Sequence, residues 1–259
     1  MKARLEFRHD ERVAFVFLAA PKANILDRDM DEALDRLFAS LEDRRDLRAI
    51  VLTADGPHFS FGASIQEHLP HEIGGALERL SNLLRRVAKA PAPTIAAIRG
   101  QCLGGALELA LACDLILAEE GSQLGIPEIK LAVFPPAASA LLPVRLGVAN
   151  ATDMVLTGRS WSGVEARQRG LVARTTPDGT LDQALESWLD EDFLPRSPSA
   201  LRFATTAIRA RVIEALERDL PRFDRLYLDE LMNEPDALEG IEAFIEKRPP
   251  VWRIRETVS

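Results

Sequence analysis

The distribution of apolar residues in the first half of the chain predicts short buried strands. Residues 4–8, which alternate charged and apolar side chains, and the apolar run at residues 13–19 flank a polar turn at residues 9–11 and predict a β-hairpin. Two further runs, at residues 49–54 and 94–100, are bounded by turn-forming residues and predict two more strands.

Helical periodicity fills the segments between these strands. Residues 27–41 repeat apolar side chains every three or four positions, with Asp27 as the expected N-cap, and residues 72–90 repeat leucines in the same way. Strands that alternate with helices form βαβ units, so we expect a mainly parallel sheet that is covered on both faces. The predicted fold class is therefore α/β.

The second half of the chain has an almost entirely helical pattern. Only residues 170–175 resemble a strand, and the amphipathic stretch at residues 235–248 predicts a last helix. Helices that follow a β/α core predict an appendage that packs on the core or on a neighbouring subunit. We expect a core at residues 1–195 that holds the active site, followed by a helical region at residues 196–259.

Composition and charge narrow the class of protein. The chain has 259 residues, of which 47% are hydrophobic and 28% charged, and its net charge is −8. Nucleic acids and anionic membranes need clustered positive potential, so we expect neither as a partner. The N-terminus lacks an apolar signal segment, and Cys102 and Cys113 lie in one apolar run, as is typical of reduced core residues. These features predict a cytoplasmic location.

Residues 102–114 place a single carboxylate in an otherwise apolar helix. Gly104 and Gly105 begin the segment, and Glu108 has no cation three or four positions away. A glutamate that is buried without a local partner loses solvation, which raises its pKa toward neutrality and suits it to proton transfer. The alternative is a structural glutamate that meets a distant arginine or caps a chain end.

The glycines before this helix predict a site where negative charge develops. N–H groups in the first turn of a helix point outward, and glycine lets a ligand approach them closely. A second glycine loop, at residues 58–70, follows the strand at residues 49–54, where parallel sheets place their ligands. We expect N–H groups near Gly62 and Ala63 to face that of Gly105 as an oxyanion hole. The spacing fits neither a phosphate loop nor a dinucleotide-binding turn.

A second candidate carboxylate, Glu128, stands twenty residues after Glu108, in a turn that follows a short strand. Two carboxyl groups around one water molecule sustain different pKa values and so separate an acid from a base. The alternative is a surface glutamate that pairs with Lys130 or caps a helix.

The histidines of this region do not predict a metal centre. His68 and His71 form a His-x-x-His pair, but the sequence offers no third ligand near them. We expect the pair to lie on a helix face, and we expect no metal site.

Three ordered motifs resemble the enoyl-CoA hydratase/isomerase, or crotonase, family. They are FSFGASIQEH at residues 59–68, the segment 100–133, and EGIEAFIEKRPPVW at residues 239–252. The resemblance extends over residues 3–253 and implies a spiral of ββα units that forms two sheets, followed by a helical trimerisation region. It also implies a homotrimer or a dimer of trimers. The apolar pattern predicts the β/α core and the helical tail, but not the spiral.

The resemblance implies roles for the candidate site residues. The N–H groups of Ala63 and Gly105 form the oxyanion hole for the carbonyl of an acyl-CoA thioester. Glu108 and Glu128 match the paired carboxylates of the hydratases, in which one activates water for attack on the β-carbon and the other delivers a proton to the α-carbon. These roles agree with the electrostatics, because an enolate that forms beside the thioester is stabilised by two N–H donors.

Coenzyme A contacts are implied for three segments of the chain. They lie in the PKAN loop, directly after Ala63 and in the last helix: Lys22, Ala23, Asn24, Ser64, Ile65, Gln66, Phe244 and Lys247. Family members often supply the last two from the next subunit. Helix packing of Phe244 and a solvated Lys22 are the alternatives. No cofactor is expected, because coenzyme A is part of the substrate.

One segment departs from the family pattern. Residues 134–143 read FPPAASALLP where many members carry a glycine-rich turn, and Pro135 and Pro136 stiffen the backbone there. The isomerase and dehalogenase branches place catalytic acidic residues in this region, but residues 131–143 contain none. This loss favours a hydratase over an isomerase.

The departure is similar to one branch of the family, the hydratases of cyclohexa-1,5-diene-1-carbonyl-CoA in anaerobic benzoyl-CoA degradation. FGASIQEHLP, VFPPAASALLP and LPRSPSALRFA carry the similarity. It implies 6-hydroxycyclohex-1-ene-1-carbonyl-CoA as product and an apolar slot for a flat ring. The candidates for that slot are Phe61, Leu69, Phe134, Pro135 and Pro136.

Other activities remain open at this point. A general short-chain enoyl-CoA hydratase, a CoA-thioester isomerase or hydrolase, and a non-catalytic acyl-CoA binding protein fit the same scaffold. The sequence also leaves open which glutamate is the base, the choice between trimer and hexamer, the stereochemistry and the physiological direction.

Overall fold

Five predicted strands lie side by side in one six-stranded sheet, and its sixth strand, at residues 115–119, was not predicted. In a computed structural model that describes residues 2–253, the spatial order of the strands is β1 (Ala3–Arg8), β2 (Val13–Leu18), β3 (Ala49–Ala54), β4 (Thr94–Ile98), β6 (Leu115–Glu119) and β9 (Arg174–Thr176). The first two form the predicted antiparallel hairpin, and every other neighbouring pair is parallel. The prediction of a mainly parallel sheet is therefore confirmed.

A second, smaller sheet runs through the same part of the chain. It consists of β5 (Gln101–Leu103), β7 (Gln123–Gly125) and β8 (Ser160–Ser162). The chain passes from β4 to β5 and then into helix α3 (Gly105–Ala112), and from β6 to β7 and then toward helix α4 (Pro136–Thr157). Each turn thus gives one strand to each sheet and then a helix, which is the ββα spiral that the family resemblance implies.

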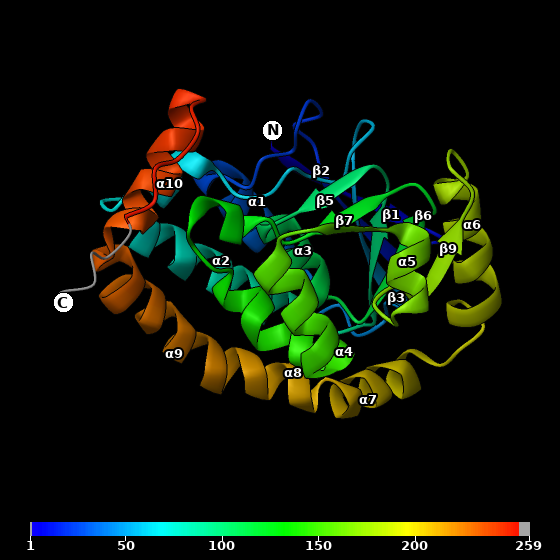
Figure 1. Cartoon of the computed structure of the whole chain (residues 1–259). Helices are drawn as coiled ribbons and strands as arrows, with labels where there is room; N and C mark the ends of the chain where they lie inside the picture. Colours follow the sequence, from blue (N-terminus) through cyan, green and yellow to red (C-terminus); the bar gives the residue numbers. More distant parts are fainter. Residues whose placement is uncertain (1, 254–259) are drawn as a thin grey trace.

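Helices cover both faces of the large sheet. Strands β2, β3 and β4 are buried at every position, as expected for a parallel sheet between two layers. One face packs in the core that includes α1 (Arg28–Ser40), α2 (Ile73–Ala88) and α3, and the other packs against α6 (Leu181–Trp188). Figure 1 shows α6 and α2 on opposite sides of the strands.

The predicted start of the first helix is confirmed in detail. The Asp27 Oδ1 atom accepts a hydrogen bond of 3.0 Å from the N–H of Met30, so its side chain satisfies one of the free donors of the first turn. The apolar stripe of this helix, which includes Met30, Leu34 and Phe38, is buried.

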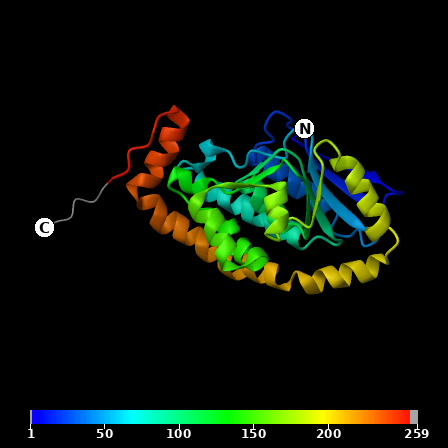
Figure 2. The same ribbon diagram turned by 45° about the vertical axis from the view of Figure 1, so that its right-hand side comes forward.

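The helices after the core form a long arc beneath α4 (Figures 1 and 2). Their bounds are α7 (Pro198–Ile208), α8 (Ala210–Glu214), η4 (Ala215–Asp219), α9 (Leu220–Arg225), η5 (Leu226–Glu230), η6 (Leu231–Asn233) and α10 (Pro235–Glu246). The shorter elements of the core are η1 (Ile65–His68), η2 (Glu128–Leu131), α5 (Gly163–Gln168) and η3 (Leu189–Phe193). The arc contacts α2 and α4 through η4, α8 and α9. The division at residues 195 and 196 stays a prediction.

One buried arginine joins this arc to the core. Arg209, between α7 and α8, donates to the carboxylate of Asp114 at 2.7 and 2.6 Å and to the carbonyls of Ala90 and Ala92 at 2.5 and 2.9 Å. Its side chain is 5% exposed and that of Asp114 15%. The guanidinium therefore satisfies two backbone carbonyls of the segment that leads into β4.

Across residues 2–253, no helix combines the length and the apolar character that crossing a bilayer requires.

Candidate active site

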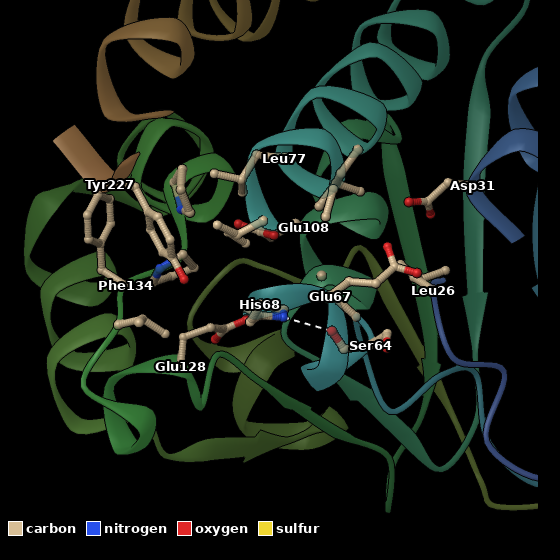
Figure 3. Close-up of a pocket in the computed structure, with 18 residues that line it drawn as sticks. Leu26, Asp31, Ser64, Glu67, His68, Leu77, Glu108, Glu128, Phe134 and Tyr227 are labelled. Atoms are coloured by element: carbon tan, nitrogen blue, oxygen red, sulfur yellow. Dashed lines mark hydrogen bonds between the residues drawn. The ribbon is translucent and has the colours of Figure 1, made fainter. Parts of the chain in front are cut away.

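A small cavity lies at the start of α3, where loops from both sheets meet. It has a volume of about 40 Å³ and is lined by Ala63, Gly105, Glu108 and Glu128. Figure 3 shows the two carboxyl groups extending into the cavity from opposite sides. The four residues that the sequence analysis placed in one site are thus brought together.

Two backbone amides, those of Ala63 and Gly105, adjoin at one wall of the cavity. The loop before η1 is held beside Leu26, whose N–H donates to Gly62 O at 2.9 Å and whose carbonyl accepts from Ser64 N at 2.9 Å. This pairing leaves the N–H of Ala63 unused between them. An added Cβ at Gly105 would lie 3.5 Å from Ala63 N, so the two amides adjoin. Among the backbone hydrogen bonds of residues 2–253 that lie outside regular helices and strands, none has the N–H of Ala63 or Gly105 as its donor.

Gly104 allows the second carboxylate to approach this wall. Its backbone adopts φ 54° and ψ −129°, which side chains disfavour, and its N–H donates to Gly125 O at 2.9 Å. An added Cβ would lie 2.5 Å from Glu128 Oε1. The glycine pair therefore serves two purposes: Gly105 makes room for Ala63, and Gly104 makes room for Glu128.

Glu108 is buried, and its carboxylate meets the start of α4. The residue is 4% exposed, and Oε1 accepts a hydrogen bond of 2.8 Å from Ala138 N. Burial raises the pKa of Glu108 from 4.5 to about 7, while the N–H groups of Ala138 and Ala137 oppose the rise. The predicted direction of the pKa shift is confirmed. The alternative role as a structural cap also holds in part. The same carboxyl group accepts a hydrogen bond from the first turn of α4 and lines the cavity.

Glu128 stands at the first position of η2, with its carboxyl group turned inward. The residue as a whole is half-buried, but Oε2 is shut off from solvent and has no hydrogen-bond partner in the described part of the chain. Burial, followed by the charge of Glu108, raises the pKa of Glu128 from 4.5 to about 8. The alternative of a surface glutamate that pairs with Lys130 is therefore wrong for this carboxyl group, because the group is buried.

The raised pKa values predict a pH-dependent stability. Both carboxyl groups bind their proton more tightly in the folded chain, so their contribution to folding is complete below about pH 4.5 and is lost as the pH rises through 7 and 8. We expect Glu128→Gln, which does not titrate, to gain stability over the wild type between pH 5 and pH 9. Urea unfolding at several pH values measures this difference, and a difference that does not change with pH would contradict the shifts.

A substitution at Gly104 tests the packing of Glu128. Gly104→Ala places a methyl group where Glu128 Oε1 lies and imposes an unfavourable backbone conformation. We expect kcat to fall at least ~10-fold, because small displacements of catalytic groups are costly. Gly179→Ala is the matched control, since Gly179 also has a positive φ but nothing lies within 4 Å of an added Cβ. Equal effects of both variants on kcat would contradict this role.

Four polar residues of the cavity wall were not predicted as site residues: Asp31, Glu67, His68 and Tyr227. His68 was expected on a helix face, but Nδ1 donates to Ser64 O at 2.8 Å and burial lowers the pKa of the ring. The neutral ring therefore keeps Nε2 as an acceptor. Burial also raises the pKa of Asp31 to about 7. His71, the other member of the pair, is exposed.

The predicted acyl pocket is realised in part. Phe134, Pro135 and Pro136 line the cavity. Phe61 instead lies in the outer groove, 42% exposed and edge-on to His58 at 4.9 Å between ring centroids. Leu69 does not line the cavity itself but packs against the apolar cluster, which includes Tyr227 and Phe134, that forms one side of its wall. The sequence placed both in the pocket because they flank the oxyanion loop, but successive residues of an extended segment point in different directions.

A wide groove of about 1000 Å³ adjoins this cavity. Ala63 and Ser64 line both the groove and the cavity. All eight residues that the resemblance assigned to coenzyme A line the groove: Lys22, Ala23, Asn24, Ser64, Ile65, Gln66, Phe244 and Lys247. Phe244 is 56% exposed and α10 brings it to the groove of its own chain. Asn24 is buried, and its amide donates to Asp55 O and His58 O at 3.0 and 3.1 Å, so its role in the loop is partly structural.

Lysine is concentrated along this groove. The chain has five lysines, and Lys2, Lys22, Lys130 and Lys247 line the groove, whereas Lys89 lies elsewhere. Lys2 forms an ion pair of 2.6 Å with Asp27. A groove with flexible positive point charges is suited to a ligand that carries several phosphates.

Between residues 2 and 253, no three His, Cys, Asp or Glu side chains are grouped so that they would hold a metal ion.

The fold and the paired carboxylates behind two amides define a class of protein. Residues 8–255 match the family described as Enoyl-CoA hydratase/isomerase, and the chain belongs to this family. The family resemblance and the α/β spiral that it implied are thereby confirmed.

Among individual relatives, the chain is 44% identical over 238 residues to "Cyclohexa-1,5-dienecarbonyl-CoA hydratase" of Thauera aromatica, covering 92% of each chain. It is 33% identical over 249 residues to "Probable enoyl-CoA hydratase" of Bacillus subtilis, covering 94% of this chain and 96% of the relative. A crystal structure of an enoyl-CoA hydratase from Mycobacterium avium subsp. paratuberculosis superposes with a TM-score of 0.86 at 23% identity. That match covers 98% of this chain and 99% of the other and shows the common fold.

Proposed function

We propose that this protein is a hydro-lyase that adds water to cyclohexa-1,5-diene-1-carbonyl-CoA and forms 6-hydroxycyclohex-1-ene-1-carbonyl-CoA. One observation supports the chemistry above all: two carboxyl groups with raised pKa values face one cavity beside the adjoining amides of Ala63 and Gly105. The relative from Thauera aromatica supports the choice of substrate.

The two amides bind the thioester oxygen. Attack of water on the β-carbon moves electron density onto this oxygen, and N–H donors that are already in place stabilise the charge without reorganisation. Loss of one such donor typically costs about 3 kcal/mol of transition-state stabilisation.

The ring diene requires protonation at an unusual position. Water forms a C–O bond at C2, the β-carbon, and the resulting enolate extends over C1, C6 and C5. A proton that is added at C5 leaves a double bond between C1 and C6, conjugated with the thioester, and this is the 6-hydroxy product after renumbering. Protonation at C1 would give an unconjugated isomer instead. The acid must therefore reach the ring carbon opposite the one that receives the hydroxyl group.

We assign the base to Glu108 and the acid to Glu128. The Ala138 N–H and the N-terminus of α4 stabilise an ionised Glu108, whereas Glu128 Oε2 has no partner in the described residues. Each charge disfavours the other, so the pair retains one proton near neutral pH. Their positions on opposite sides of the cavity suit attack at C2 and protonation at C5.

The groove lysines bind the phosphates of coenzyme A in this proposal. We expect Lys22→Ala and Lys247→Ala each to raise KM several-fold with little change in kcat, and the effect to shrink as salt is added. Lys89→Ala is the matched control, because that lysine lies outside the groove. An effect on kcat rather than on KM, or an equal effect of Lys89→Ala, would contradict this role.

The wider setting follows from the same proposal. The reaction needs no cofactor, since coenzyme A is part of the substrate, and it belongs to anaerobic benzoyl-CoA degradation in the cytoplasm. We propose a homotrimer or a dimer of trimers, in which the helical region at residues 196–259 forms the contacts between subunits.

A direct assay tests the function. The purified protein is incubated with cyclohexa-1,5-diene-1-carbonyl-CoA and, separately, with crotonyl-CoA, and addition of water is followed by mass spectrometry. We expect faster turnover of the ring diene. Turnover of crotonyl-CoA alone would indicate a general short-chain hydratase, movement of a double bond without water an isomerase, and binding without turnover a non-catalytic acyl-CoA binding protein.

A further inference from the structure

Tyr227 brings a third polar group into the cavity from the helical arc. It lies on η5, about one hundred residues after the glutamates, and it is 1% exposed. Its hydroxyl group has no hydrogen-bond partner within residues 2–253. Figure 3 shows the hydroxyl end of the ring directed toward the interior of the cavity.

The position of this ring is fixed by packing rather than by polar contacts. Its centroid lies 5.5 Å from that of Phe134, and both rings belong to the apolar cluster that closes this side of the cavity. A buried hydroxyl group without a partner costs about 1–3 kcal/mol. Phenylalanine would fill the same space without this cost, so packing alone gives no reason for the hydroxyl group.

The two carboxyl groups keep the hydroxyl group protonated. Burial, Glu128 and Glu108 together raise the pKa of Tyr227 above its ordinary value of 10. At any physiological pH it is therefore a hydrogen-bond donor. Glu128 Oε2 is a second buried oxygen of the same cavity without a partner.

We propose that Tyr227 is a further catalytic residue, whose hydroxyl group donates a hydrogen bond to the attacking water and afterwards to the hydroxyl group of the product. This inference rests on the proposed hydratase function. The water gives its proton to the Glu108 carboxylate and forms the new C–O bond, while its oxygen keeps one lone pair for the Tyr227 hydroxyl group. A cavity of about 40 Å³ is large enough for such a water, and a buried water needs two or more polar partners.

The proposal explains how the site distinguishes its product from an unhydroxylated ring. A site that is built to hydrogen-bond a ligand hydroxyl group rejects an analogue that lacks it, because the protein group is then left unpaired. Tyr227 is also the only tyrosine of the chain, so its ring gives an unambiguous spectroscopic signal.

Kinetics of Tyr227→Phe provide the first test. We expect kcat on the ring diene to fall about 10- to 100-fold with KM within twofold, and the melting temperature to stay equal or rise. A kcat within twofold of the wild type would overturn the proposal. A fall in kcat that is accompanied by a melting temperature several degrees lower would also overturn it, because it would indicate a structural role.

Binding provides a test that does not depend on turnover. The probes are 6-hydroxycyclohex-1-ene-1-carbonyl-CoA and its analogue without the hydroxyl group, cyclohex-1-ene-1-carbonyl-CoA. We expect Tyr227→Phe to weaken binding of the first about tenfold and to leave the second unchanged. Phe134→Leu, the packing control, should alter both equally. In protein labelled with ¹³C at tyrosine Cζ, the single resonance should shift more with the hydroxylated ligand. Equal effects of Tyr227→Phe on both ligands would refute the proposal.

These tests separate the inference from the function on which it rests. A wild-type protein that does not hydrate the ring diene refutes the proposed substrate. A wild-type protein that does so, together with an unaffected Tyr227→Phe variant, refutes only the role of Tyr227.

Discussion

Glu108→Gln and Glu128→Gln should each lower kcat at least ~10²-fold, which is the usual loss when a positioned acid or base is removed. Gln at position 108 still accepts the Ala138 N–H through its amide oxygen, so the start of α4 stays capped but no proton is taken from water. Gln at position 128 keeps the volume of the side chain but has no acidic proton to give. Steady-state kinetics on the ring diene, with calorimetric binding of the product, separate these losses from a loss of affinity.

A matched control guards this prediction. Glu78→Gln changes an exposed carboxylate on α2 and should leave kcat unchanged. Groups that act as a unit in one reaction are not additive, so the double variant should be about as slow as the slower single variant. Wild-type activity of either single variant would reduce that glutamate to a structural role, and losses that multiply would contradict a shared step.

Arg209→Met should destabilise the protein by about 3–5 kcal/mol, because it leaves the buried Asp114 carboxylate without its partner. The same change removes the donors to the carbonyls of Ala90 and Ala92. Chemical denaturation monitored by circular dichroism measures the loss. The helical arc should detach from the segment before β4 at a lower denaturant concentration than the sheet unfolds. The unfolding transition should therefore also broaden.

An exposed arginine two residues later provides the comparison. Arg211 is 81% exposed and pairs with Glu214 on the surface, so Arg211→Met should change stability by no more than about 0.5 kcal/mol. Arg209→Met together with Asp114→Asn should recover part of the loss, since the uncompensated charge is then gone. A loss below about 1 kcal/mol for Arg209→Met would show that the buried ion pair does not hold the arc.

The sequence predicts five of the six strands of the large sheet, because these leave a local signal, but it misses β6 (Leu115–Glu119). Residues 13–18 are apolar without interruption, residues 49–54 are apolar except for Thr53, and Asp27 gives the first helix a recognisable cap. The small sheet leaves a weaker signal, and only its strand β7, the short strand expected before Glu128, was predicted. Its strands have only three residues each, too few to establish a period of two, and β8 follows a helical pattern closely. The spiral therefore follows from family resemblance and not from the pattern.

The residues of the site also divide into those that the sequence predicts and those that only the structure reveals. Glu108 is conspicuous because a carboxylate in an apolar helix is rare, and the glycines beside it point to a close approach. Tyr227 does not stand out from its neighbours in the sequence, because an aromatic residue in an amphipathic helix is typical of core packing. Only the folded helical arc brings it to the cavity. His68 is similar: its spacing from His71 suggests a helix face, whereas the hydrogen bond to Ser64 O turns the ring inward.

A crystal structure with cyclohexanecarbonyl-CoA, a saturated analogue that cannot react, tests the central claim most directly. We predict a thioester oxygen about 2.7–3.1 Å from the N atoms of both Ala63 and Gly105. The ring should lie between the carboxyl groups of Glu108 and Glu128, with one of them on each side. A thioester oxygen that binds elsewhere, or a carboxyl group that turns away from the ring, would contradict the account.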